Sequence, residues 1–157
     1  MPTWQKPEDT LLLDILDQAY ERKAWHGPNL RQSLRGVPAK IAARRPAPGR
    51  HNIWEIAVHA AYWKYRVRRR LRADKPGSFA LEGHNWFKRP VELNEKAWRK
   101  DLALLETEHR KLRQALADYL AGKTRQVPAR LIFGAALHDV YHAGQIRLLR
   151  RLHGGKS

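Results

Sequence analysis

Two histidines near the C-terminal end of the sequence have the spacing of a metal-binding pair. His138 and His142 lie four residues apart in the segment HDVYHAGQI, so on a helix they share one face, one turn apart. Neutral imidazoles presented from a rigid helix form half of a site for a divalent metal ion. His59, in the segment IWEIAVHAAYWKY, supplies a third candidate ligand from another helix. Three histidines would leave coordination positions open to water or substrate, as in catalytic metal sites.

These histidines also have a structural explanation, because a histidine in a helical core commonly forms a hydrogen bond with a neighbouring group. His109 shows the same ambiguity. It is the one imidazole in a leucine-rich stripe, so it is either a fourth ligand or a buried polar group bonded to a neighbour. The sequence has no His-Glu-x-x-His pattern, which excludes the mechanism of zincin proteases.

Two polar residues beside the histidines are candidate catalytic groups. Glu55 precedes His59 by about one helical turn, so it could orient that imidazole or act as a base on bound water. Glu55 also follows Asn52 by three residues, the spacing of a capping box, which gives it a structural alternative. Gln145 follows His142 by three residues and could contact a bound ligand.

Two further residues are candidates for contacting a substrate. Trp63 follows His59 by four residues and Arg66 follows it by seven, so the three side chains share one stripe of the predicted helix. We expect this stripe to face inward. Arg66 would then hold an anionic group of the substrate, and Trp63 would form part of the core or of the pocket wall.

Four segments have the apolar periodicity of helices, and none alternates convincingly like a strand. They cover about residues 8–25, 52–72, 94–121 and 129–152. The segment between the first two helices contains several prolines and glycines, with room for one or two short helical turns. The third helix is the most regular, with a leucine-rich seam that predicts packing against a partner helix.

The connection between the second and third predicted helices is long. It spans about 20 residues, to about residue 93, whereas connections of about 2–8 residues are usual in helical bundles. We therefore expect a crossover, with the second and third helices parallel. Residues 1–157 are predicted to form one all-α domain, a four-helix bundle in which inward side chains of facing helices can build a metal site.

The composition fits one globular domain. The chain has 157 residues, 43% of them hydrophobic, and no cysteine, so disulfides and thiolate metal sites are excluded. The polar N-terminal segment lacks the pattern of a signal peptide, and no apolar run approaches the roughly 20 residues of a membrane span. We expect a cytoplasmic protein.

The net charge of +16 allows a second hypothesis. A basic surface is typical of proteins that bind nucleic acid or another polyanion, although it can also have no specific partner. The arginine-rich end of the second predicted helix could contact phosphates or could complement the helix dipole. No nucleic-acid-binding motif is present, so a non-catalytic basic binding module is the alternative and not the favoured function.

The sequence resembles the DinB/YfiT-like superfamily over most of its length. The resemblance rests on a Trp-Glu-Ile-x-x-His pattern from Trp54 to His59, the crossover, and HDVYHAGQI in the last helix. It implies an up-down-down-up four-helix bundle with a metal site formed by His59, His138 and His142. Nickel or zinc is the metal expected from the resemblance.

The resemblance also implies a range of functions. Similar proteins include thiol-dependent S-transferases and a maleylpyruvate isomerase that use low-molecular-weight thiols, and they often form homodimers. The resulting hypothesis is a metal-dependent enzyme in which three imidazoles hold an ion that activates water for hydrolysis or a thiol for transfer to a small-molecule electrophile. The high positive charge and the arginine-rich second helix are not part of the family pattern.

Overall fold

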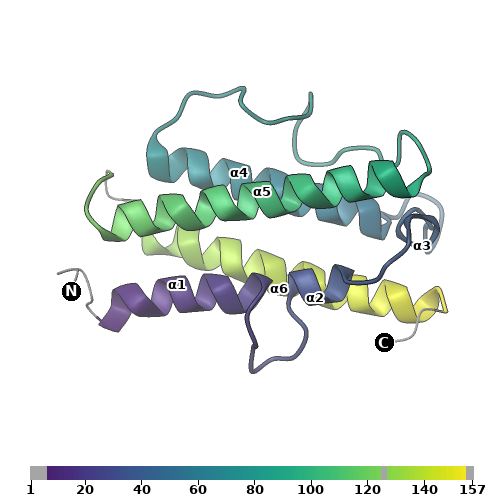
Figure 1. The fold of residues 1–157 in the computed structure, drawn as a ribbon, viewed down its shortest axis with the longest axis horizontal. Coiled ribbons are helices and arrows are strands. Elements are labelled where there is room, and N and C mark those ends of the chain that lie inside the picture. The colour runs from purple at the N-terminus through teal and green to yellow at the C-terminus, as the bar shows by residue number, and fades with distance from the viewer. Residues whose placement is uncertain (1–6, 125–126, 155–157) are drawn as a thin grey trace.

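The computed structural model describes residues 7–124 and 127–154, and within these ranges all regular structure is helical. Its elements are α1 (Pro7–Tyr20), α2 (Leu30–Leu34), α3 (Ala39–Ala42), α4 (Ile53–Arg72), α5 (Glu95–Leu120) and α6 (Ala129–Leu152). The long helices lie side by side, with α2 and α3 toward one end (Figure 1). An all-α structure is therefore confirmed. None of the helices in these ranges has the length and apolar character needed to cross a bilayer.

Side-chain caps determine where α4 and α5 begin. The Asn52 side chain accepts the backbone N–H of Glu55 at 2.8 Å, and the Asn94 side chain accepts that of Ala97 at 2.8 Å. Each cap satisfies an N–H that the first helical turn leaves without a partner. The predicted helix starts are correct to within one residue, and the predicted bounds of α6 match the structure.

The first helix is shorter than predicted. α1 ends at Tyr20, whereas the periodicity indicated a helix to Trp25. The Asp17 carbonyl accepts the N–H groups of both Glu21 and Arg22, which closes the last turn. The chain then leaves the bundle, and the Trp25 side chain is 99% exposed. Trp25 therefore gains no burial in the core that would favour a longer helix.

The crossover determines the direction of the helices around the site. Residues 73–94 carry the chain back along the bundle, so α4 and α5 run in the same direction and α6 runs opposite to α4 (Figure 1). α4 packs against both α5 and α6, and α1 also packs against both. The central segments of α4 and α6 therefore face each other.

The core consists of two apolar clusters separated by buried polar side chains. The cluster next to α2 and α3 includes Trp54, Trp98 and Ile146, and the cluster at the other end includes Leu16, Leu71 and Leu112. Between them lie Lys64, His109 and Asp139, one from each of α4, α5 and α6, all at most 2% exposed. A polar layer thus crosses the middle of the bundle.

Candidate metal centre

Three imidazoles meet between α4 and α6. His59 Nε2 lies 3.1 Å from His138 Nε2, and His142 Nε2 lies 3.0 Å from the same atom. His59 and His142 are buried, and His138 is half-buried. The four-residue spacing places His138 and His142 on one face of α6, and the packing of α4 against α6 brings His59 into contact with both. The structure therefore brings together the three histidines that the sequence indicated as ligands.

The outer ring nitrogens of two of these histidines are held by hydrogen bonds. His59 Nδ1 lies 2.8 Å from the backbone oxygen of Asn85, and His142 Nδ1 lies 2.7 Å from the amide Oε1 of Gln145. Both partners are oxygens that can only accept, so each Nδ1 must carry the hydrogen. The Nε2 atoms of His59 and His142 therefore present lone pairs to His138.

This arrangement fits a bound cation. A single hydrogen on His138 Nε2 can satisfy one of the two short contacts, so the other would place two lone pairs against each other. A cation between the rings removes this repulsion. Imidazole bonds of about 2.0–2.1 Å to one ion are compatible with nitrogen atoms about 3 Å apart. An all-imidazole donor set suits zinc, nickel, copper or iron.

Burial keeps the three imidazoles in the form that binds metal. It lowers the pKa of His59 to about 4 and that of His138 to about 3, mainly because the protonated rings would lose their solvation. Burial also lowers the pKa of His142. All three rings are therefore neutral at pH 7, and a metal ion need not compete with protons for them.

Glu55 is connected to His59 indirectly, through the stacked rings of His51 and Trp86. Its carboxylate forms hydrogen bonds with Arg45 and with His51 Nδ1. The His51 ring stacks on Trp86 at 3.6 Å between centroids, and Trp86 stacks on His59 at 3.7 Å. Glu55 thus supports one wall of the centre without a hydrogen bond to His59.

The capping-box prediction for Glu55 is half correct. Its N–H is capped by Asn52, but its carboxylate accepts hydrogen bonds from Arg45, from His51 and from the backbone N–H of Arg89. Burial favours the neutral carboxyl, yet these hydrogen bonds outweigh it and lower the pKa of Glu55. This makes the carboxylate a weaker base, and a catalytic role for Glu55 stays a prediction.

The crossover supplies two contacts that the sequence analysis missed. Asn85 has a left-handed backbone with φ of +62°, which asparagine adopts more readily than most residues. In this conformation its carbonyl accepts from His59, and its side-chain oxygen accepts the indole N–H of Trp63 at 2.9 Å. Trp86 comes from the same irregular segment. No periodic pattern marks these positions, so spacing arguments could not find them.

The other predicted site residues lie near the centre in different roles. Gln145 holds the His142 ring, and its amide N–H donates to the hydroxyl of Tyr141 at 3.1 Å. Trp63 is 38% exposed and its ring lies 6.2 Å from that of His138. Trp63 and the exposed Tyr141 therefore flank the histidines where they approach the surface, which suits a wall for substrate.

The prediction that Arg66 faces inward is wrong. Its side chain is exposed, and its guanidinium donates to the hydroxyl of Tyr62 at 3.1 Å. The side chain that faces inward on this part of α4 is that of Lys64, which is not in the predicted stripe of His59, Trp63 and Arg66. The nearby arginines do not form one free phosphate-binding surface, because Arg68 is buried against Glu108 and Arg45 pairs with Glu55.

Behind the three imidazoles, a buried ion pair joins α4 to α6. The Lys64 ammonium donates to the carboxylate of Asp139 and lies 3.3 Å from His109 Nδ1. Asp139 is fully buried, so this ion pair lies inside the bundle and not on its surface. Because Asp139 directly follows His138, this ion pair anchors the turn of α6 that carries the candidate ligands His138 and His142.

His109 belongs to a separate cluster of potential ligands with Asp17 and Glu21, between α1 and α5. Arginines already neutralise both carboxylates. Asp17 accepts two hydrogen bonds from Arg113, at 2.7 and 2.9 Å, and Glu21 pairs with Arg110. The cluster is therefore an ion-pair network. Of the two alternatives for His109, the structure supports a buried polar group in contact with a neighbour, Lys64, and not a fourth metal ligand.

Comparison with protein families supports the resemblance seen in the sequence. A model of the DinB superfamily matches residues 24–146. The chain belongs to the DinB superfamily. The matched segment contains all three histidines of the centre, together with the crossover that holds His59. Beyond this DinB match, comparison with curated proteins and with solved structures found none that is similar.

Proposed function

We propose that this DinB-superfamily protein is a metal-dependent enzyme with its centre at His59, His138 and His142. The convergence of three Nε2 atoms, two of them forced to present lone pairs, is the observation that carries the proposal. A divalent ion bound there would act as a Lewis acid and lower the pKa of a water molecule or a thiol. The reaction class is hydrolysis or transfer of a thiol to an electrophile.

Different residues of this chain have different roles in the proposed centre. The three imidazoles would hold the ion, while Asn85 and Gln145 fix the orientation of His59 and His142. Trp86 covers the face of His59 and excludes water from it. Trp63 lies beside the half-buried His138 and Tyr141 lies beside His142, where a small molecule would approach. The donor set is compatible with zinc and nickel, the two metals that the family resemblance implies, and a low-molecular-weight thiol is the proposed co-substrate.

Metal content tests the proposal directly. Purified protein stripped with a chelator and dialysed against zinc or nickel should retain about one ion per chain by elemental analysis. His138→Ala and His142→Ala should each lower the affinity sharply, and the double variant should retain none. The exposed crossover residue His84 provides a matched control, because His84→Ala removes an imidazole outside the centre.

Far-UV circular dichroism shows whether each variant still folds. Stoichiometric metal in the folded double variant, or none in the parent protein, would overturn the proposed centre. Parent protein with metal is then assayed with ester substrates and with thiols plus electrophiles, using the double variant as the inactive reference. Catalysis that is equal in both would contradict a role for the centre. Formation of a homodimer stays a separate prediction, measured by sedimentation.

A further inference from the structure

A cavity lies on α4, beyond the candidate metal centre. It has a volume of about 500 Å³, is open to solvent on one side, and is lined by the C-terminal half of α4 and the first part of the crossover. The α4 side chains that line it are Tyr62, Tyr65, Arg66 and Arg69, and the crossover contributes Phe79 and Leu81. Arg66 follows His59 by seven residues, about 10 Å of helix rise, so this cavity is distinct from the three histidines.

The two arginines of this cavity are not neutralised by acidic side chains. Among the described residues no carboxylate forms an ion pair with Arg66 or Arg69, although Arg68 and Arg72 on the same helix both pair with Asp74. Arg66 donates to the Tyr62 hydroxyl, and Arg69 donates to the Asp74 backbone oxygen at 3.3 Å. Each guanidinium has five N–H donors, so most remain free for a ligand.

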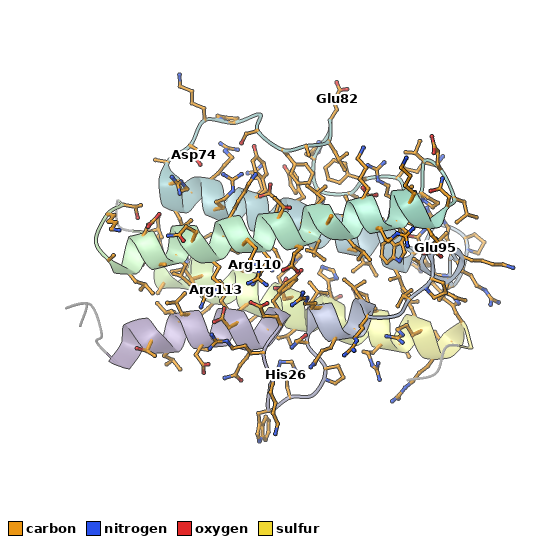
Figure 2. All side chains as sticks on the ribbon, in the orientation of Figure 1. His26, Asp74, Glu82, Glu95, Arg110 and Arg113 are labelled. Carbon is orange, nitrogen blue, oxygen red and sulfur yellow. The ribbon has the colours of Figure 1, made fainter. Side chains whose placement is uncertain are left out.

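Glu82 also borders the cavity but does not neutralise it. Its carboxylate extends outward from the crossover, away from α4 (Figure 2). The cavity therefore has two positive charges on its α4 wall. The expected ligand is an anion.

Aromatic rings hold the two guanidinium groups in place. The Arg66 guanidinium lies 5.8 Å from the centre of the Tyr62 ring, and that of Arg69 lies 5.6 Å from the centre of the Tyr65 ring. Such contacts restrict side chains that otherwise lose much entropy when they bind a ligand. Both tyrosines are buried, so their rings are fixed supports.

The opposite wall is held to the same helix. The Tyr65 hydroxyl accepts the backbone N–H groups of Gly77 at 3.1 Å and Ser78 at 3.2 Å, which attaches the start of the crossover to α4. Phe79 then packs edge-on against Tyr62, with ring centres 5.3 Å apart. The cavity therefore combines positive charge with a flat apolar wall.

We propose that this cavity binds a small molecule with a phosphate or carboxylate group attached to a flat apolar body. The anionic group would accept hydrogen bonds from Arg66 and Arg69, and the apolar body would lie against Phe79 and Leu81. The proposal goes beyond the metal-dependent activity and does not depend on it.

Calorimetric titration of chelator-treated protein tests this proposal without a contribution from bound metal. Phenyl phosphate and benzoate are the anionic probes, and phenol is the neutral probe of similar shape. At least one anion should bind about tenfold or more tightly than phenol, and the tighter anion identifies the preferred group. If neither anion binds more tightly than phenol, the proposal is wrong.

Variants separate a built site from general attraction to a protein of charge +16. Arg66→Met and Arg69→Met should each weaken binding of the preferred anion about tenfold, because each removes a charge-assisted contact. Arg70→Met is the matched control, since Arg70 is exposed on the same helix and lies outside the cavity lining. Its affinity should change less than twofold.

A steric variant tests the cavity with all charges retained. Ala80 is exposed at the cavity lining, so Ala80→Trp should fill the space and weaken binding about tenfold. An equal loss in Arg70→Met and the two cavity variants would show nonspecific attraction and overturn the proposal. Unchanged affinity in Ala80→Trp would do the same.

Discussion

At the scale of single residues, the candidate metal centre depends on atoms that would not touch a bound metal. The hydrogen bonds at Nδ1 determine which nitrogen of His59 and of His142 faces inward. Without its acceptor, a ring could rotate or change its tautomer, and the converging lone pair would be lost. Gln145 is the partner most accessible to mutation, because the acceptor at His59 is a backbone carbonyl.

We expect Gln145→Ala to weaken metal binding by about 10–100-fold, the usual effect of removing a group that orients a ligand. Gln145→Glu keeps an acceptor oxygen at the same place and should restore most of the affinity. Competition with a chromophoric chelator measures both constants. Equal affinities in the alanine variant and the parent protein would show that His142 is oriented by its packing alone.

At the scale of helices, the buried pair between Lys64 and Asp139 connects α4 to the ligand-bearing turn of α6. Lys64→Met would leave the carboxylate of Asp139 buried and unpaired, which typically costs about 3–5 kcal/mol. Urea denaturation should show this loss, while the exposed-site variant Arg70→Met should change stability by less than about 0.5 kcal/mol.

A second substitution separates charge from packing at this position. Lys64→Met combined with Asp139→Leu removes both charges, and such replacements often restore stability. We therefore expect the double variant to be more stable than Lys64→Met. If it is less stable, shape and not the unpaired charge accounts for the effect at Lys64.

The sequence predicted the boundaries of most helices, but it did not predict which side chains from different helices and from the crossover contact one another. Asn52, Asn94 and Pro128 mark helix starts through local chemistry, so these boundaries could be read directly. The burial of Lys64 depends on partners from α5 and α6, which no pattern within α4 indicates. The three histidines that meet between α4 and α6 were predictable from spacing, whereas the contact from Asn85 depends on the path of an irregular crossover.

At the scale of the whole molecule, the buried neutral histidines make the metal-free protein sensitive to acid. The folded pKa of His59 is about 4 and that of His138 about 3, whereas an unfolded histidine titrates near 6.5. Between these values the unfolded chain binds protons that the folded chain does not. Stability is therefore full above pH 6.5 and falls as the pH decreases toward 4.

The expected loss between pH 7 and pH 5 is about 2 kcal/mol for each of these two imidazoles, at about 1.4 kcal/mol for each pH unit below 6.5. Urea denaturation of chelator-treated protein at both pH values measures it. A variant with leucine at positions 59 and 138 should lose clearly less stability over the same interval. An identical loss would show that other groups determine the acid sensitivity.

The stack of His51, Trp86 and His59 has an optical consequence. The indole of Trp86 is fluorescent and lies face to face with the His59 ring. A paramagnetic ion such as nickel, if bound by His59, would quench its emission. The difference between the parent spectrum and that of Trp86→Phe isolates this signal from the other five tryptophans. Binding of such an ion at the proposed centre would thus be measurable by tryptophan fluorescence, without any added dye.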